Sequence, residues 1–228
     1  MTSVADWVYG WDDTPGIVSV YADREGRAVL WRRVGGALVR EQARFRPWLL
    51  AAHLDDLAHL GPALREGDEA PIGYRRLDGP DASYRYLLTA RSGRALEAAL
   101  LAGASRRLGR PLASLHDLDD YYRVGPVEQY LIATGRVCFR GLTYADLHRM
   151  QVDLETTALD PAEGRIFMVA VRDSRGLAVT LEAPAPEDEA RLIAELCALV
   201  RERDPDVIEN HNLFGFDLPF LEARAAAL

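Results

Sequence analysis

Two acidic residues separated by one position, Asp153 and Glu155, are the first group in this sequence that could do chemistry. On a β-strand, residues i and i+2 point to the same face, so both carboxylates would project together while Leu154 points to the opposite side. Two neighbouring carboxylates repel each other unless a cation lies between them, and carboxylate oxygens suit Mg²⁺ or Mn²⁺. The spacing therefore indicates a divalent-metal site on a strand.

The spacing alone is not specific, because Asp23 and Glu25 have it too. That pair lies in a polar stretch that is typical of a solvated turn. The pair Asp153 and Glu155 instead ends an apolar stretch and is followed by two threonines, beginning with Thr156. The sequence context favours the second pair as the functional one.

The second group follows another short apolar stretch and reads Asn-His-Asn-Leu-Phe-Gly-Phe-Asp over residues 210–217. The loop would lead Asp217 into the first turn of the last helix. An acid there is also explained by the helix dipole, and Asn212 is also explained as a turn former. Phe214 and Phe216 are more typical of a core than of a surface on which bases stack. Structural and functional interpretations of these residues therefore both stay open.

The elements that must position these groups begin near residue 150. Alternating and apolar stretches predict three strands joined by tight turns, then a helix with an apolar face, a fourth strand and a last helix. Their expected ranges are 151–155, 165–171 and 177–182 for the meander, a helix starting near Pro186, a strand over 206–210 and a helix over 216–228. The predicted order is βββαβα.

The first half of the chain has a different pattern. It predicts a small α+β domain over residues 1–110, with strands at 18–22, 27–32, 36–41, 45–52 and 84–89 and a helix over 94–108. Pro47 would place the fourth of these strands at a sheet edge. Residues 111–149 read as a packed connecting segment with a short helix near 127–134, and the second domain would span 150–228.

Composition bounds the class of protein. With 228 residues, 49% hydrophobic and 27% charged, the chain is typical of a globular protein, and it has no apolar run long enough to span a membrane. The N-terminus has no secretory pattern, so a cytoplasmic location is expected. The two cysteines, Cys138 and Cys197, fit neither a disulfide framework nor a zinc site, and we expect buried free thiols.

Charge is unevenly distributed. Residues 1–150 carry 20 arginines against 19 acids, whereas residues 151–228 carry 7 against 16, and the chain has no lysine and only two asparagines, Asn210 and Asn212. A net charge of −8 argues against a protein that simply coats DNA, since such proteins have a basic footprint. It is compatible with an enzyme that gathers carboxylates around a divalent metal.

The two groups, in this order, resemble the proofreading 3′–5′ exonuclease domain of family B DNA polymerases, which has a DnaQ-like, ribonuclease H-like fold. Asp153-Leu154-Glu155 is similar to the family's Asp-x-Glu motif, and Asn212 with Phe216-Asp217 is similar to its Asn-x(2–3)-Phe/Tyr-Asp motif. Softer matches lie at 44–49, similar to a strand of the family's N-terminal domain, and at 126–135, similar to the entry into the exonuclease domain.

The resemblance implies an α/β ribonuclease H-like exonuclease domain, a mixed sheet with flanking helices, after a small α+β N-terminal domain. It implies that Asp153, Glu155 and Asp217 coordinate two ions, Mg²⁺ or Mn²⁺, for hydrolysis of phosphodiester bonds. It further implies contacts with the 3′ end of single-stranded DNA, from Thr156 and Asn212 to the terminal nucleotide and from Phe216 near the unpaired end.

One departure matters: the family's third exonuclease motif lies downstream of the second, and this chain ends at Leu228. We therefore expect the chain to be a partial exonuclease domain, completed by the remainder of a polymerase or of a related nuclease, or to self-associate over apolar sheet surface. One alternative is a non-catalytic nucleic-acid-binding or scaffolding module with an incomplete site. Another is an α/β domain whose motifs are coincidental.

Overall fold

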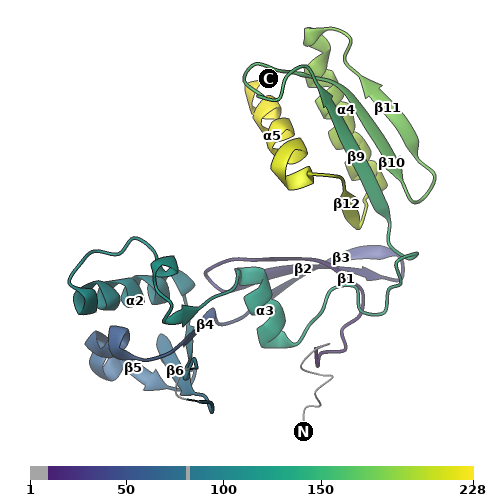
Figure 1. The fold of residues 1–228 in the computed structure, drawn as a ribbon. Coiled ribbons are helices and arrows are strands. Elements are labelled where there is room, and N and C mark those ends of the chain that lie inside the picture. Colours follow the sequence, from purple (N-terminus) through teal and green to yellow (C-terminus); the bar gives the residue numbers. More distant parts are fainter. Residues whose placement is uncertain (1–9, 81–82) are drawn as a thin grey trace. The chain divides into compact units, whose positions relative to one another are not determined.

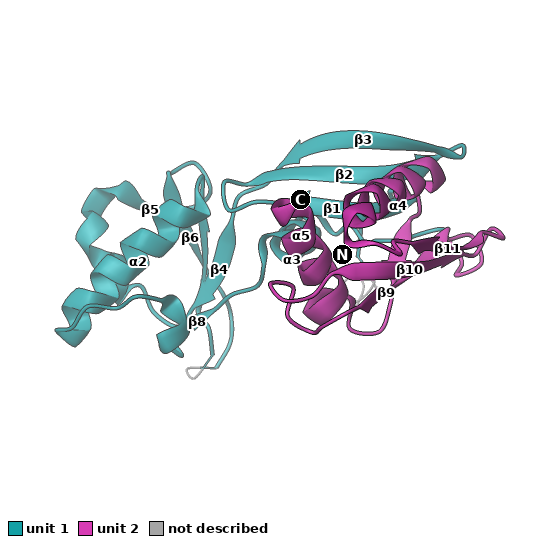
Figure 2. Cartoon of the chain, turned by 90° about the horizontal axis from the view of Figure 1, so that it is seen from above, with its two compact units in different colours: residues 1–141 teal, residues 142–228 magenta. Residues whose placement is uncertain are grey.

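The computed structural model describes residues 10–80 and 83–228, and the chain divides into two compact units, residues 1–141 and residues 142–228 (Figure 2). Among the described residues, unit 1 has two sheets and two buried apolar clusters, and unit 2 has one of each. The domain bounds expected from the sequence, 1–110 and 150–228, remain predictions. No helix of the described residues is long and apolar enough to cross a membrane.

The first sheet of unit 1 is an antiparallel meander of three strands, β1 (Ile17–Ala22), β2 (Arg27–Val34) and β3 (Ala37–Arg44), in that order (Figure 1). Side chains alternate between the two faces of a strand, and Ala28 and Leu30 of β2 point to the buried face. There they pack with Tyr130 of α3 (Pro126–Thr134). The helix therefore covers one face of this sheet.

The second sheet of unit 1 has the order β5-β6-β7-β4-β8. The strands are β4 (Trp48–Ala51), β5 (Leu64–Glu66), β6 (Ile72–Arg76), β7 (Tyr86–Ala90) and β8 (Tyr121–Tyr122). The edge position expected for the strand at 45–52 is wrong, because β4 lies between β7 and the short β8. Pro47 precedes β4, so its missing N–H costs the strand ladder no hydrogen bond.

Helix α2 (Gly93–Leu108) packs against this sheet and against the 3₁₀ helix η1 (Asp55–Ala63), while a second 3₁₀ turn, η2, covers Leu115–Asp117. The N-cap of α2 is Ser92, whose hydroxyl oxygen accepts a hydrogen bond from the Ala95 amide at 3.2 Å. A Cβ added at Gly103 would lie 1.6 Å from the Asp56 carbonyl oxygen. Only glycine therefore allows α2 and η1 to approach so closely, and this contact sets the position of Asp56.

Unit 2 has the predicted order βββαβα. It comprises β9 (Arg149–Thr156), β10 (Ile166–Asp173), β11 (Ala178–Glu182), a 3₁₀ turn η3 (Pro186–Asp188), α4 (Glu189–Arg203), β12 (Val207–Glu209), a π-helical turn η4 (Leu213–Asp217) and α5 (Leu218–Ala227). The sheet order is β11-β10-β9-β12, with β12 parallel to β9 and the other pairs antiparallel. The mixed sheet expected from the resemblance is confirmed.

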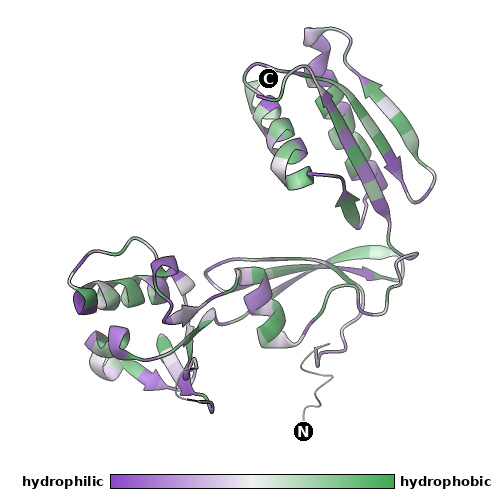
Figure 3. Ribbon diagram, viewed as in Figure 1, coloured by the Kyte–Doolittle hydropathy of each residue, from purple (hydrophilic) through white to green (hydrophobic). Residues whose placement is uncertain are grey.

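One face of this sheet is covered by α4 and α5. Val152 and Leu154 of β9 pack there with Leu192 and Leu196 of α4 and with Phe220 of α5. Figure 3 shows hydrophilic and hydrophobic residues mixed along β9, β10 and α4, as expected for elements that bury one face only. The residues of β9 between the buried ones therefore point to the uncovered face.

A buried ionic group fixes the beginning of β9. His148 Nε2 lies 2.8 Å from Asp173 Oδ2, and Arg203 Nη2 of α4 lies 2.7 Å from the same oxygen. Burial alone would raise the pKa of Asp173, but hydrogen bonds from His148, from the Leu177 amide and from Arg203 outweigh it and hold the pKa well below 3.8. The aspartate is therefore ionised and joins β9, β10 and α4.

Two local expectations need correction. The helix expected over 216–228 begins only at Leu218, because residues 213–217 form a π-helical turn. Both cysteines are free, as expected, but Cys138 and Cys197 are half-buried rather than buried.

Candidate functional site

Strand β9 presents Asp153 and Glu155 on the uncovered face of the unit 2 sheet, as their spacing predicted. Both side chains are exposed, and Leu154 between them is buried. Their cross-strand partners on β10 are Ala170 and Met168. The register shifts next to Met168, and such a bulge bends a strand and re-aims its side chains. The two carboxylates therefore lie on an accessible surface beside an irregular stretch of β10.

The partner strand on the other side ends early. β12 stops at Glu209, opposite Gln151, so β9 continues beyond it with backbone that no strand pairs on that side. The loop after β12 fills this place. Asn210 Nδ2 donates to Asp153 Oδ1 at 3.1 Å, and the His211 amide donates to Asn210 Oδ1 at 2.7 Å. Asn210 was not among the predicted site residues, although the scarcity of asparagine elsewhere in the chain was a signal.

Asn212 starts the π-helical turn in the left-handed conformation, with φ 60°. Its carbonyl oxygen accepts bonds from the Gly215 and Phe216 amides at 3.0 and 2.9 Å. A Cβ added at Gly215 would lie 2.2 Å from Asn212 Oδ1, so the asparagine side chain folds over the glycine. The predicted spacing of Asn212 and Asp217 is therefore that of a single folded turn, of a kind often found at functional sites.

Asp217, the last residue of that turn, is only 4% exposed. Its Oδ1 accepts a bond from the Leu154 amide at 3.4 Å, and its Oδ2 is buried with no hydrogen-bond partner. Asp217 borders a pocket of about 290 Å³ that is lined mainly by apolar side chains of β9, α4, β12 and α5. A buried carboxylate oxygen without a partner is costly, so this atom is suited to a cation or to a hydrogen-bond donor.

The three predicted metal ligands, Asp153, Glu155 and Asp217, are called the Asp217 site below. The Leu154 amide brings Asp217 against the residue between the two β9 acids. The carboxylate oxygens of these three residues are nevertheless not all within 4.8 Å of one another. Among the described residues, only one group of acids and histidines is that close, and it lies in unit 1. The structure brings the elements of the Asp217 site together without closing the three carboxylates on one point.

The other predicted contacts are engaged within the unit. The Thr156 hydroxyl donates to the Ala158 carbonyl oxygen at 2.9 Å. The Phe216 ring is half-buried and lies 5.4 Å, between ring centroids, from that of Phe220. Phe214, for which the sequence favoured a core position over a surface for bases and left both open, is 84% exposed on the π-helical turn. Phe216 has the core contact instead.

An open groove of about 820 Å³ lies on the uncovered face beside Asp153, the one predicted metal ligand among the residues that line it. Asp153, Asn210 and His211 line one side of it, and small side chains, Ala170 and Thr180, form its floor. The groove gives the predicted catalytic carboxylate access to a ligand of considerable size.

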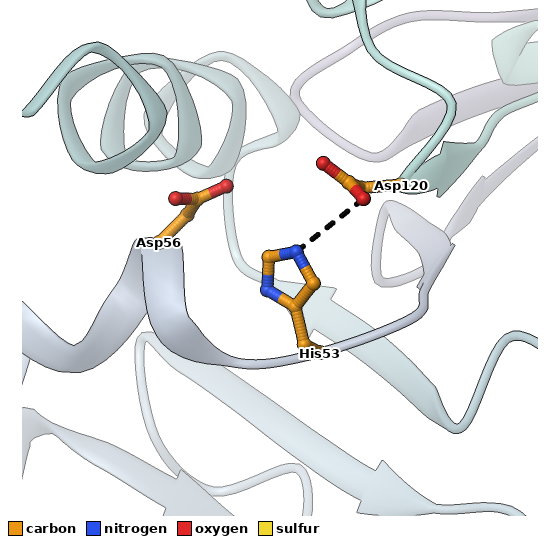
Figure 4. Close-up of side chains that lie close together, drawn as sticks. All are labelled: His53, Asp56 and Asp120. Atoms are coloured by element: carbon orange, nitrogen blue, oxygen red, sulfur yellow. Dashed lines mark ion pairs between the residues drawn. The ribbon is translucent and has the colours of Figure 1, made fainter. Parts of the chain in front are cut away.

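Unit 1 contains the one group of described residues whose possible ligand atoms all lie within 4.8 Å: His53, Asp56 and Asp120, called the Asp56 cluster below (Figure 4). His53 Nε2 lies 3.5 Å from Asp120 Oδ1. Arg107 donates to both oxygens of Asp56, at 2.8 and 3.0 Å, and to Asp120 at 2.8 Å, and the Tyr121 hydroxyl donates to Asp56 as well. A guanidinium therefore already supplies the cation in this cluster.

Three comparisons with known proteins show what the chain is similar to. Residues 169–228 match the model of the exonuclease domain of DNA polymerase family B. The chain is 32% identical over 117 residues to DNA polymerase 1 of Pyrococcus abyssi, a match that covers 47% of this chain and 15% of that protein. It is 31% identical over 117 residues to a DNA polymerase of Thermococcus aggregans, covering 6% of that protein.

Among solved structures, the family B DNA polymerase of Pyrobaculum calidifontis matches with a TM-score of 0.64 and 23% identity, covering 93% of this chain and 32% of that one. At this identity the match concerns the fold. Residues 169–228 of unit 2 are therefore similar to a family B exonuclease domain, in line with the resemblance seen in the sequence, and the chain spans only 15% of the length of the Pyrococcus abyssi polymerase that it matches.

Proposed function

We propose that unit 2 is part of a metal-dependent 3′–5′ exonuclease that hydrolyses phosphodiester bonds at the 3′ ends of DNA. The observation that carries the proposal is the buried, unpartnered Oδ2 of Asp217, held against the β9 residue between Asp153 and Glu155. Buried polar atoms in proteins are nearly always hydrogen-bonded, and an exception often marks a functional group or a bound ion or water. The match to a family B exonuclease domain supports the same conclusion.

The residues present fit a pair of hard divalent cations. Asp153, Glu155 and Asp217 offer only carboxylate oxygens, the ligands that Mg²⁺ and Mn²⁺ prefer. When bound, such ions activate a water molecule and neutralise charge on the scissile phosphate.

The chain's own residues would position acid and substrate. Asn210 holds one oxygen of Asp153 by its side-chain amide, which orients the other oxygen. The groove beside Asp153 would receive the terminal nucleotide. Asn212, Thr156 and Phe216, the contacts that the family resemblance implies, are not among the residues that line this groove. A single strand suits this open surface, because its bases are splayed and free to stack on aromatic side chains.

A second candidate function is a non-catalytic nucleic-acid-binding module. The observation that favours it is that the carboxylates of the Asp217 site are not all within 4.8 Å of one another. The remainder of a polymerase chain, acting as a partner of this region, would then carry any catalysis.

The deciding experiment is shortening of 5′-labelled single-stranded DNA in Mg²⁺ or Mn²⁺, followed on a sequencing gel. We expect stepwise shortening by the chain or, where the site needs the remainder of a polymerase, Mn²⁺ binding without shortening, and we expect the loss of both in Asp153→Ala/Glu155→Ala. The matched control is Glu163→Ala/Glu187→Ala, which removes two exposed acids from the same unit and should behave as the unchanged chain does. Shortening or Mn²⁺ binding that survives in the first variant would overturn the site, and a chain that binds DNA but neither shortens it nor binds Mn²⁺ would favour the second function.

A further inference from the structure

The uncovered face of the three-stranded sheet in unit 1 is rich in arginine and carries an exposed tyrosine. Register places Tyr21 of β1, Val29 of β2 and Gln42 of β3 in one row across the sheet. The neighbouring outward positions of β3 are Arg40 and Arg44, both exposed. The Tyr21 side chain is 56% exposed. An aromatic ring and two guanidinium groups therefore share one flat surface, opposite the face that α3 covers.

The charge of this face is not neutralised by the protein. Arg40 and Arg44 have no ion-pair partner among the residues that the structure describes. Glu41 points to the other face, where it pairs with Arg32. The acid at the edge of the surface is Asp23, which accepts two backbone amides of its own turn and the side chain of Arg27. The surface is therefore basic although the chain is acidic.

A shallow depression of about 420 Å³ lies on this face. Tyr21 and Val29 line it together with Arg40, Gln42 and Arg44. It is neither an apolar groove suited to a hydrophobic segment nor a deep pocket. A surface that combines cations with an exposed ring, without deep walls, is the arrangement that binds the backbone and bases of a single strand.

We propose that this face binds single-stranded DNA, with Arg40 and Arg44 on phosphates and a base stacked on Tyr21. A duplex presents no free base face to the ring, so the tyrosine contributes only to a single strand. The surface lies in unit 1 and needs no metal ion, so it is a binding site separate from the Asp217 site. It goes beyond the proposed exonuclease activity and does not depend on it.

The test uses the full chain and a fluorescein-labelled oligothymidylate in EDTA, which prevents metal-dependent hydrolysis, with the Kd measured by fluorescence anisotropy at several salt concentrations. Arg40→Glu/Arg44→Glu should raise the Kd by about tenfold or more, and each lost phosphate contact should reduce the slope of log K against log salt by about 0.7. The matched control is Arg106→Glu/Arg110→Glu, which makes the same charge change at exposed positions in and after the last turn of α2. Equal weakening by both variants would overturn the proposal.

The ring is tested separately. Tyr21→Leu should raise the Kd by about fivefold or more, since stacking of one base on an aromatic side chain contributes about 1–3 kcal/mol. Tyr122→Leu, at a tyrosine that is 48% exposed in the other sheet, should leave it unchanged. Circular dichroism of each variant checks folding. Tighter binding of a duplex of equal length, or of an oligouridylate, would overturn the assignment to single-stranded DNA.

Failure of this proposal is distinguishable from failure of the exonuclease proposal. Asp153→Ala/Glu155→Ala should abolish shortening of DNA and leave the effect of Arg40→Glu/Arg44→Glu on the Kd intact. If Arg40→Glu/Arg44→Glu does not change the Kd in the Asp153→Ala/Glu155→Ala variant, the sheet surface is not a DNA site, whatever the exonuclease assay shows.

Discussion

Two carboxylate clusters, one in each unit, contrast in a way that bears on metal binding. The Asp56 cluster has ligand atoms within 4.8 Å of one another, whereas the Asp217 site does not. Asp56 and Asp217 are both buried, at 1% and 4% exposure. They differ in what satisfies them, because both oxygens of Asp56 accept bonds from Arg107 while Oδ2 of Asp217 has no partner.

Proximity of ligand atoms is therefore a weaker sign of a metal site than a buried carboxylate oxygen without a partner. Burial alone would raise the pKa of Asp56, but the hydrogen bonds from Arg107 and Tyr121 outweigh it and hold that pKa below 3.8. A metal ion there would have to displace a guanidinium that already makes two charge-assisted bonds. At the Asp217 site an incoming cation would displace no such partner.

The largest expected effect separates the two clusters by activity. Asp217→Asn should reduce the rate of DNA shortening by about 10³-fold, because several kcal/mol of transition-state stabilisation depend on the metal ligands and each 1.36 kcal/mol is tenfold in rate. Asp56→Asn should leave the rate per folded molecule unchanged. Both rates are measured by single-turnover assay in Mg²⁺. A large loss in Asp56→Asn with intact folding would place the metal in unit 1 instead.

The second effect concerns stability, where the substitution at Asp56 should matter more than the one at Asp217. Asp56→Asn should destabilise unit 1 by about 3–5 kcal/mol, because it breaks a buried pair and leaves Arg107 with a weaker partner. Asp217→Asn should cost nothing or stabilise unit 2, because Oδ2 has no hydrogen bond to lose and the amide oxygen can still accept from the Leu154 amide.

Urea unfolding can assign these changes to the units. All four tryptophans lie within residues 1–141, so tryptophan fluorescence reports unit 1, and hydrogen exchange of β9 amides reports unit 2. Equal destabilisation by the two substitutions would mean that Asp217, like Asp56, has a structural role.

Much of unit 2 was predictable because its patterns are local. The pair Asp153 and Glu155 is set by the two-residue period of a strand, and the order βββαβα follows from apolar periodicity and turn residues. The neighbouring strands β9, β10 and β11 of the sheet confirm the predicted three-stranded meander. In unit 1 the strands β5, β6 and β8 were missed. With three and two residues, β5 and β8 are too short to show a period.

The site itself was less predictable, since it depends on where the loop after β12 runs. Sequence spacing placed Asp217 at a helix start, but its bond to the Leu154 amide arises because β12 ends early, which no local pattern signals. The same holds for Asn210, which binds Asp153 across the sheet. The π-helical turn reversed the expected exposure of Phe214 because it adds a residue to the turn.

The third effect is the pH dependence of the stability of unit 1. The pKa of Asp56 is lower in the folded protein than its ordinary 3.8, so its ionised form stabilises unit 1 fully at pH values above 3.8. That contribution is lost as the pH falls below 3.8 and through the lowered folded-state pKa. We expect the stability of unit 1, measured by fluorescence between pH 3 and pH 7, to fall more steeply at the acidic end in the wild type than in Asp56→Asn. Parallel curves would show that Asp56 is not the titrating group.

The smallest effect concerns the two phenylalanines of the π-helical turn, Phe214, which is exposed, and Phe216, which is half-buried. Phe214→Ala should change the stability of unit 2 by no more than about 0.5 kcal/mol, as is usual for exposed positions. Phe216→Ala should cost more than that, since its ring packs on Phe220, although less than the about 3–5 kcal/mol of a fully buried phenylalanine.

Because the Phe214 ring is free to stack on a base, its loss should weaken binding of a single-stranded 3′ end severalfold in an anisotropy titration with EDTA. Weaker binding in Phe216→Ala alone would instead place the unpaired end against the half-buried ring, as the family resemblance implies.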